Sequence, residues 1–329
     1  MKQIIITIAA LMTLLSCGGQ KEKEVTNKNK GNMTQITYHK IQVEDCKVFY
    51  REAGNPEKPT ILLLHGFPSA SHMFRELMPE LADEFHLIAP DFPSFGQTES
   101  PSRERLRVGD QGSGMEFTYS FDHLAKIVDK FTETVGLSKF AMYVFDYGAP
   151  IGYRLAMWHP ERITAIISQN GNMYEEGLGK KWEARKAYWK NPTPELRQQF
   201  SSAFALETII DQYTFGTPEG SVGPDGYSLD YYYVNLPGRA EMQNDLILDY
   251  RSNVALYPEF QKYLRENQPP LLAVWGENDP SFTPAGAEAF KRDLPNVEIH
   301  FVPSGHFALE SHYTEIANYI KDFMKRVMK

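Results

Sequence analysis

The residue with the clearest chemical potential is Asp146, which lies between a buried strand and a helix. Residues 140–145 form an apolar and aromatic run typical of a buried strand, and helix-like apolar spacing begins at Gly148. The sharp corner lifts the Asp146 carboxylate off the sheet, where the first amides and the positive dipole end of the helix stabilise an anion. Asp146 is therefore a candidate nucleophile, and the alternative is that it caps the helix.

Three further groups of polar residues follow expected strands. They are residues 65–68 after the run 60–64, Glu277 and Asp279 after 271–275, and His306 after 297–302. Open α/β sheets bind ligands at the carboxyl ends of their strands, so we expect these groups to meet around Asp146. Gly66 permits a tight turn that can direct the Phe67 amide towards Asp146. The order along the chain is nucleophile, acid and base.

Alternating strand and helix patterns predict the sheet that brings these positions together. The expected strands are 36–43 and 47–51 as an edge hairpin, then 60–64, 85–89, 140–145, 163–168, 271–275 and 297–302. The expected helices include 73–81, 119–135 and 312–328. Such alternation predicts a mainly parallel sheet covered on both faces, with residues 34–170 and 269–329 as the core.

One segment, residues 171–268, interrupts this alternation. It contains short helical patterns rich in Trp, Tyr and Phe, separated by clusters of Pro and Gly. We expect a helical insertion that caps the carboxyl ends of the strands.

The composition limits the class of protein. Of 329 residues, 42% are apolar and 23% are charged, which is ordinary for a soluble protein with a large core. The net charge of -8 argues against nucleic acid or an anionic membrane surface as a partner. His72, His123, His159 and His312 show no metal-binding spacing and are interpreted as surface or packing residues. No phosphate-binding loop is present, so neither a metal nor a cofactor is expected, and the oligomeric state stays open.

Five motifs give the chain from about residue 34 onwards a resemblance to a known family. They are HGFP at 65–68, APDFPSFGQTES at 89–100, VFDYGAP at 144–150, WGENDP at 275–280 and SGHFALE at 304–310. With them the chain resembles α/β-hydrolases of the epoxide hydrolase and haloalkane dehalogenase group, which carry Asp as the nucleophile. The resemblance implies the α/β-hydrolase fold, a mainly parallel doubly wound sheet with a helical cap domain. Val144 departs from the small residue usual at its position and predicts a slightly reshaped corner.

The resemblance also implies a two-step hydrolysis. Asp146 is ionised at neutral pH and attacks a substrate carbon without a base, which gives an alkyl ester. His306, oriented by Asp279, then activates the water that hydrolyses this ester. The backbone N–H groups of Phe67 and Tyr147 form the oxyanion hole.

Two residues compete for the acid that orients the histidine. The resemblance favours Asp279 over Glu277. The other strand end where such proteins carry this acid reads Ser-Gln-Asn at 168–170 and holds no carboxylate.

The residues beside the nucleophile favour an epoxide over a halide as the reacting group. A departing halide needs N–H donors, which dehalogenases of this group take from a Trp after the nucleophile, whereas Tyr147 and Phe67 offer no side-chain N–H. Fluoroacetate dehalogenases bind their substrate through arginines near the nucleophile, and Arg154 lies two helical turns away. An epoxide oxygen instead needs a proton donor, such as the phenol of a cap tyrosine.

Asp249-Tyr250-Arg251 resembles the late-cap segment that carries such a tyrosine, so Tyr250 is the candidate proton donor. Tyr188 or Tyr213 is the candidate second donor. The expected substrate is a small apolar epoxide. The alternatives are a haloalkane dehalogenase with the same nucleophile and a non-catalytic ligand-binding homologue.

The N-terminus resembles a bacterial lipoprotein signal. Lys2 precedes an apolar run at 4–15, and Leu14-Leu15-Ser16-Cys17 is similar to a lipobox in which Cys17 is lipidated. Residues 18–33 are polar and are expected to form a flexible tether. These features predict a lipid-anchored protein of the bacterial cell envelope, with an ordinary secretory signal as the alternative.

Overall fold

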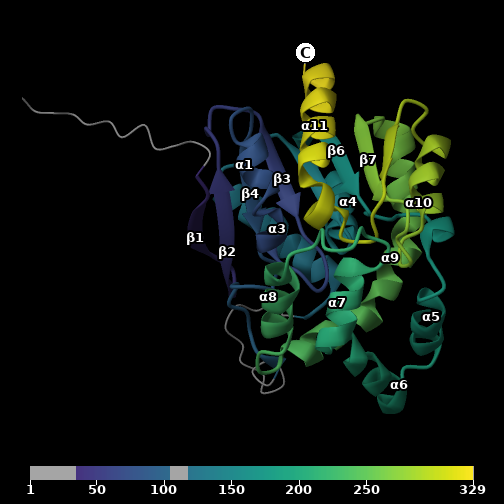
Figure 1. Cartoon of the computed structure of the whole chain (residues 1–329). Helices are drawn as coiled ribbons and strands as arrows, with labels where there is room; N and C mark the ends of the chain where they lie inside the picture. Colours follow the sequence, from purple (N-terminus) through teal and green to yellow (C-terminus); the bar gives the residue numbers. More distant parts are fainter. Residues whose placement is uncertain (1–34, 104–117, 329) are drawn as a thin grey trace, which may run out of the picture. The chain divides into compact units, whose positions relative to one another are not determined.

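The computed structural model describes residues 35–103 and 118–328. Eight strands form one sheet in the order β1-β2-β4-β3-β5-β6-β7-β8 (Figure 1). Their bounds are β1 Thr37–Val43, β2 Cys46–Ala53, β3 Thr60–Leu64, β4 His86–Pro90, β5 Phe140–Phe145, β6 Ile163–Gln169, β7 Leu271–Gly276 and β8 Glu298–Val302. Strand β2 pairs antiparallel with β1 and β4, and all other neighbours pair parallel. The predicted α/β fold is confirmed.

The central strands are buried on both faces. Every residue of β4, β5 and β7 is buried, which is why these strands read as continuous apolar runs. Strand β3 pairs with β5 in parallel register, and β5 pairs with β6, so the carboxyl ends of all three meet at one edge of the sheet.

Helices flank the sheet. Helix α1 packs against α11, and α3 packs against α4. Their bounds, with the shorter elements of the core, are η1 Ser71–Phe74, α1 Leu77–Leu81, α3 Phe121–Thr134, α4 Gly148–Trp158, η2 Pro160–Arg162, α10 Pro284–Ala289, η5 Phe290–Arg292 and α11 Ala308–Val327. The single helix expected at 73–81 is therefore two short elements. Helix α11 begins four residues before the expected 312, with non-helical backbone at His312.

The chain between β6 and β7 is helical. Its elements are η3 Glu175–Gly177, α5 Trp182–Lys190, α6 Pro194–Gln199, η4 Phe200–Phe204, α7 Leu206–Thr214, α8 Pro224–Val234 and α9 Arg239–Asn267. We call residues 171–268 the cap segment. Figure 1 shows its helices gathered at one end of the sheet. Helix α9 contacts α3, α4 and α5, so it joins the cap segment to the core helices.

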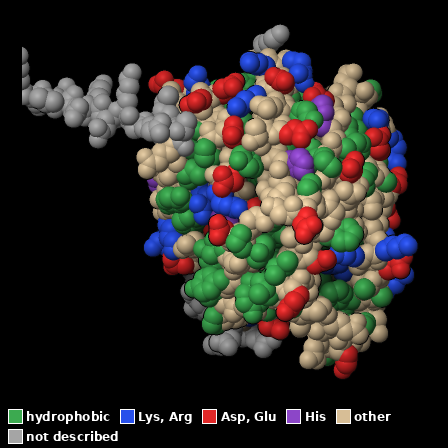
Figure 2. Space-filling model, in the orientation of Figure 1, with side chains coloured by type: hydrophobic (Ala, Val, Ile, Leu, Met, Phe, Trp, Pro, Cys, Tyr) green, Lys and Arg blue, Asp and Glu red, His purple; other side chains and the backbone are tan. Residues whose placement is uncertain are grey.

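The surface carries acidic and basic side chains side by side over the face seen in Figure 2. Hydrophobic side chains gather over the region where Figure 1 shows α8, and that helix carries Tyr231 and Tyr232 with exposed side chains. Within residues 35–103 and 118–328, we find no helix with the length and apolar content that crossing a bilayer requires.

Candidate active site

Asp146 occupies a strained corner between β5 and α4. Its φ of 45° lies in the left-handed region, which residues other than glycine rarely adopt. Residues held in this conformation cluster at functional sites. The N-cap position of α4 belongs to Tyr147, and no side chain caps the helix there. The Asp146 carboxylate instead accepts a 2.7 Å hydrogen bond from the Phe67 N–H through Oδ1. The geometry therefore does not support the N-cap interpretation.

Glycines allow this corner to pack closely. A Cβ at Gly66 would lie 2.4 Å from the Asp146 Cβ, so only glycine lets the loop after β3 approach the carboxylate. A Cβ at Gly152 would lie 2.7 Å from Val144 Cγ1. The larger side chain at Val144, two residues before the corner, is thus accommodated by the missing side chain on the facing turn of α4.

His65 braces the loop that carries the Phe67 amide. Its Nε2 accepts a 3.0 Å hydrogen bond from the Phe92 N–H, so its Nδ1 is the protonated nitrogen and faces the Gly66 carbonyl at 3.3 Å. Burial lowers the pKa of His65 to about 3, and the ring is therefore neutral. The loop is fixed without a charge next to Asp146.

The structure brings the three predicted triad residues together. His306 Nε2 lies 3.7 Å from Asp146 Oδ2, and His306 Nδ1 lies 2.7 Å from Asp279 Oδ2. All three side chains are buried. The other oxygen of Asp279 accepts the backbone N–H groups of Ser281 at 2.7 Å and of Phe282 at 3.1 Å. Glu277 is exposed, and the acid beside the histidine is Asp279.

The charges around His306 control its protonation. Burial by itself lowers the pKa of this imidazole, but the Asp279 charge and the hydrogen bonds with Asp146 and Asp279 outweigh burial and raise the pKa to about 10. His306 is thus an imidazolium held between two carboxylates while Asp146 is ionised. Any reaction that removes the Asp146 charge removes part of this stabilisation and lowers the pKa of His306.

Asn170 is a site residue that the sequence analysis did not identify. It follows β6, at the strand end noted for its missing carboxylate, and its Nδ2 donates to Asp279 Oδ2 at 2.6 Å. The same Asp279 oxygen faces His306 Nδ1. The amide therefore fixes the acid from a neighbouring strand. The signal was present in the Ser-Gln-Asn strand end, because an amide there can donate to an acid on the next strand.

Tyr250 of α9 lies beside the corner. Its ring centroid is 5.7 Å from that of Tyr147 and 4.5 Å from that of Trp182. Its hydroxyl is 3.4 Å from the Tyr257 hydroxyl, which also accepts from Asn172 Nδ2 at 3.4 Å. Burial, together with the charges of Tyr257 and Asp146, raises the pKa of Tyr250 well above its usual value. The phenol stays protonated at neutral pH.

Tyr257 is the second phenol near the corner, one the sequence analysis did not single out. Burial raises the pKa of Tyr257 above its usual value, and Asp146 adds to this effect. Tyr250 and Tyr257 are seven residues apart on α9 and therefore lie on one face of the helix, two turns apart. That spacing was the available signal.

The other predicted tyrosines lie elsewhere. Tyr213 donates to Asp230 Oδ2 at 2.5 Å and stacks on Phe307 at 3.9 Å between ring centroids, and so belongs to a separate buried network. Tyr188 packs against the Phe200 ring at 5.3 Å. The structure does not bring either hydroxyl to Asp146.

The indole N–H groups around the site already have acceptors. Trp182 donates to the Ser281 carbonyl at 2.9 Å, Trp189 donates to the Ile247 carbonyl at 2.9 Å, and Trp275 donates to the Phe282 carbonyl at 2.7 Å. Trp158, the fourth tryptophan of the chain, is exposed at the end of α4. No tryptophan is therefore oriented as a halide donor at Asp146.

Arg154 is buried and held by core and cap partners. It pairs with Asp122 at 2.6 Å and donates to Asn253 Oδ1 at 2.8 Å. Its guanidinium binds α4 to α3 and α9 and does not face Asp146 as a carboxylate-binding group.

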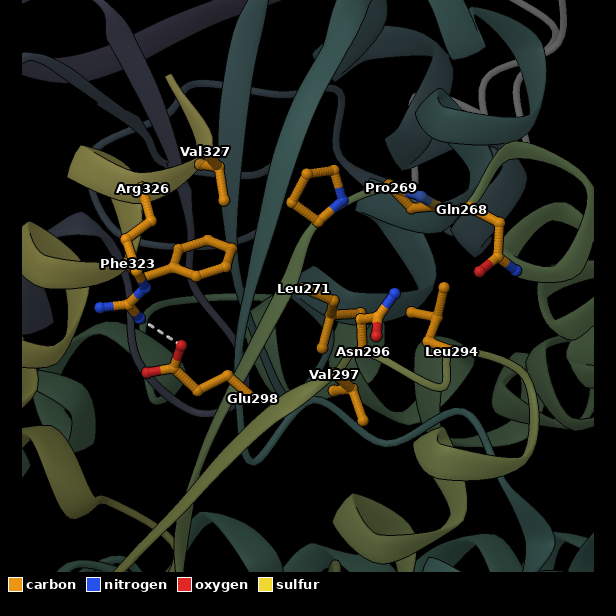
Figure 3. Close-up of a pocket in the computed structure, with 11 residues that line it drawn as sticks. Gln268, Pro269, Leu271, Leu294, Asn296, Val297, Glu298, Phe323, Arg326 and Val327 are labelled. Atoms are coloured by element: carbon orange, nitrogen blue, oxygen red, sulfur yellow. Dashed lines mark hydrogen bonds and ion pairs between the residues drawn. The ribbon is translucent and has the colours of Figure 1, made fainter. Parts of the chain in front are cut away.

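Two other features bear on ligands. Among the described residues, no group of three or more His, Cys, Asp or Glu is arranged to hold a metal ion. A cavity of about 300 Å³ lies at the amino ends of β7 and β8, lined by Leu271, Glu298, Phe323 and Arg326 among others (Figure 3). The candidate active site is at the carboxyl ends of these strands, so the cavity in Figure 3 is a separate feature.

An eight-stranded, mostly parallel sheet with polar side chains at the carboxyl ends of β3, β5, β7 and β8 defines the class of α/β hydrolases. Residues 59–313 match the family described as the alpha/beta hydrolase fold, and the chain belongs to that family.

Similar proteins indicate which α/β hydrolases this chain is related to. An uncharacterized hydrolase of Saccharomyces cerevisiae is 46% identical over 86% of this chain and 95% of its own length. Haloalkane dehalogenase 2 of Mycobacterium tuberculosis is 26% identical over 72% of this chain and 77% of its own length. Epoxide hydrolase 3 of Mus musculus is 22% identical over 89% of this chain and 78% of its own length. The solved structure of a haloalkane dehalogenase from Bradyrhizobium elkani matches with a TM-score of 0.72 at 20% identity. The match covers 89% of this chain and 99% of the dehalogenase. The chain is a hydrolase related to both groups.

The predicted location as a lipid-anchored protein of the bacterial cell envelope is wrong. The relative that is 46% identical comes from yeast, a eukaryote, which points away from a bacterial envelope lipoprotein. Cys17 and the expected signal and tether, residues 1–33, lie outside the described residues. The prediction rested on Lys2, the apolar run at 4–15 and the lipobox-like residues 14–17, a short pattern without a folded context.

Proposed function

We propose that this protein hydrolyses epoxides to vicinal diols through a covalent ester on Asp146. The observation that carries the proposal is the pair of buried phenols, Tyr250 and Tyr257, beside a corner where the indole N–H groups are already occupied. An epoxide oxygen needs a proton donor as its C–O bond breaks, whereas a halide needs N–H donors. The cap segment, through Tyr250, covers the reacting centre and excludes bulk water.

In the first step, the Asp146 carboxylate attacks one epoxide carbon, and the C–O bond to that carbon breaks. The oxygen that leaves the carbon takes the proton of Tyr250, and the neighbouring Tyr257 hydroxyl stabilises the resulting phenolate. The product is a hydroxyalkyl ester of Asp146. The negative charge of the carboxylate has moved to the phenol, so the net charge of the site is unchanged.

The second step depends on the altered protonation of His306. Loss of the Asp146 charge lowers the pKa of the imidazolium, whose proton returns to the Tyr250 phenolate through water that has entered the site. Neutral His306, oriented by Asp279 at 2.7 Å, then takes a proton from water. The hydroxide attacks the carbonyl carbon of the ester, and the C–O bond to the carboxyl carbon breaks to release the diol. Asp146 and the imidazolium are regenerated.

The Phe67 N–H serves both states of Asp146. It donates to Oδ1 of the free carboxylate at 2.7 Å. The same donor is positioned for the oxyanion that develops on this oxygen when water attacks the ester. We propose the Tyr147 N–H, at the start of α4, as the second donor.

The test is the mass of the intact protein after incubation of a His306→Gln variant with matched panels of terminal epoxides and 1-haloalkanes. Without a base, the ester should accumulate, and the mass should rise by that of the whole epoxide. A His306→Gln/Asp146→Ala double variant is the control and should remain unmodified. An adduct from haloalkanes alone would favour the dehalogenase that the relatives also include. No adduct from either panel would favour a ligand-binding homologue.

A further inference from the structure

Arg185 lies on the face of α5 that covers the candidate active site. Trp182, Arg185 and Trp189 are three and four residues apart and therefore share one stripe of this helix. The Trp182 and Trp189 ring centroids lie 4.5 Å and 6.2 Å from that of Tyr250. Arg185 shares this stripe with the two tryptophans that pack on Tyr250, so its side chain leaves α5 on the same side as these rings.

Aromatic rings hold this guanidinium in place. Its central carbon lies 4.9 Å from the Trp182 ring centroid and 5.9 Å from that of Phe200. Arg185 is half-buried, and Nη1 donates to the Lys181 carbonyl at 3.2 Å. Stacking on aromatic faces orients the planar group and leaves other N–H donors for a ligand.

Two cations near Arg185, Lys181 at the N-cap of α5 and Lys186, have acidic partners, whereas no ion pair is found for Arg185 among the described residues. Lys181 pairs with Asp211 at 3.7 Å, and Lys186 pairs with Glu175 at 3.9 Å. The charge of Arg185 acts on the phenol of Tyr147, the residue after Asp146. Burial and the Asp146 charge raise the pKa of the Tyr147 phenol, and Arg185 opposes this rise. An arginine without an acidic partner among the described residues therefore lies on Trp182, whose ring packs against Tyr250.

We propose that Arg185 binds a carboxylate of the substrate, so that the protein acts on amphipathic epoxy acids whose apolar chain lies among the aromatic rings. The fork of guanidinium donors matches the two oxygens of a carboxylate. This inference rests on the proposed epoxide hydrolysis for its reaction, but the recognition of the carboxylate can be tested separately.

The binding test uses octanoate and octanamide, which differ only in the charged group, with isothermal calorimetry on the full chain. We expect octanoate to bind wild type at least about tenfold more tightly than octanamide. Arg185→Gln should abolish this preference, and Arg185→Lys should keep part of it. Lys186→Gln removes a charge one residue away and should keep all of it. Equal binding of both ligands to wild type, or equal effects of Arg185→Gln and Lys186→Gln, would overturn the proposal.

The kinetic test compares a medium-chain ω-epoxy acid with its methyl ester. We expect a higher kcat/KM for the acid in wild type, and in Arg185→Gln a loss of about tenfold for the acid with little change for the ester. Turnover of the methyl ester but not of the acid would refute carboxylate binding by Arg185 and would still support epoxide hydrolysis. Binding of octanoate through Arg185 without turnover of any epoxide would support carboxylate binding and refute epoxide hydrolysis.

Discussion

At the scale of single residues, the account depends on the charge between Asp146 and His306. The imidazolium lies between two carboxylates, 3.7 Å from one and 2.7 Å from the other. In the proposed mechanism, esterification neutralises the first carboxylate, which converts His306 from an ion-pair partner into a base. His306 would then act only after the first step is complete, so that water is not activated before the ester exists.

Phenol donors on α9 give the first residue-scale prediction. Tyr250→Phe should lower the rate of ester formation from an epoxide about 100-fold, because a general acid contributes about 10²–10⁴. Tyr257→Phe should cost less, since its hydroxyl acts through Tyr250. Single-turnover mass spectrometry measures both. Tyr232→Phe, which changes an exposed phenol of α8 outside the site, is the matched control; an equal loss there would refute the assignment of Tyr250.

The hydrogen bond from Asn170 to Asp279 gives the second residue-scale prediction. Asn170→Ala removes the 2.6 Å hydrogen bond to Asp279 Oδ2. We expect ester hydrolysis to slow about tenfold or more, because bonds to charged groups are worth about 1.5–3 kcal/mol. Ester formation should change little, so the ester should accumulate in the variant. A drop in ester formation of the same size would show that Asn170 supports the whole corner instead.

The sequence allowed side chains to be positioned where each one directly follows a strand. Asp146, Asp279 and His306 each follow a recognisable strand, and parallel pairing brings strand ends together whatever the details of packing. Tyr188 and Tyr213 could not be placed in this way, because helix packing in the cap segment decides which face of α5 or α7 meets the core. To identify Tyr257 as a site residue, one had to know that α9 directs one face towards Asp146.

At the scale of elements, a buried polar cluster attaches the cap segment to the core. His72 of η1 lies 2.9 Å from Asp230 Oδ1 of α8, and Tyr213 of α7 donates to the other oxygen of Asp230. The side chains of His72 and Asp230 are 5% and 0% exposed. The cluster fixes two cap helices against η1. It also keeps the Tyr213 ring on Phe307, the residue after His306.

Removing one partner of this cluster should destabilise the fold. His72→Ala should lower the free energy of unfolding in urea by about 3 kcal/mol, because it leaves Oδ1 of the buried Asp230 carboxylate without its histidine partner. The double variant His72→Ala/Asp230→Ala should be more stable than the sum of the single losses predicts. Glu133→Gln breaks an exposed pair with Lys130 and should have no measurable effect. Strict additivity of the two core changes would contradict the coupling.

Element boundaries illustrate what periodicity can and cannot give. Strands β3, β5 and β7 begin and end within one residue of the expected runs, because their burial on both faces leaves apolar residues only. Helix α11 starts at Ala308, before the expected His312, because its buried first turn is separated from the regular helix by non-helical backbone at His312, which apolar spacing does not reveal. The long α9 contains Pro258 and lacks strong amphipathic spacing, so its length was not evident.

At the scale of the whole molecule, two histidines with opposite pKa shifts shape the dependence of stability on pH. The pKa of His306 is raised to about 10, so its contribution is complete below the unfolded value of about 6.5 and is lost as pH rises towards 10. The pKa of His65 is lowered to about 3, so stability falls as pH drops below about 6.5.

We therefore expect maximal stability near neutral pH. Between about pH 6.5 and 10 the free energy of unfolding should fall at a limiting slope of about 1.4 kcal/mol per pH unit. His306→Gln should flatten this alkaline limb and leave the acid limb unchanged. Urea titrations of both proteins from pH 5 to 9.5 measure the difference. Parallel curves for the two proteins would show that His306 is not held as an imidazolium.

The central claim is that water frees the product from Asp146 and does not attack the epoxide directly. The most direct measurement is a single turnover in ¹⁸O-labelled water with the protein in excess over an epoxide, followed by peptide mass spectrometry. We predict that the label enters the Asp146 carboxylate and that the first diol carries unlabelled oxygen from Asp146. Label in the diol, with an unlabelled Asp146, would contradict the account.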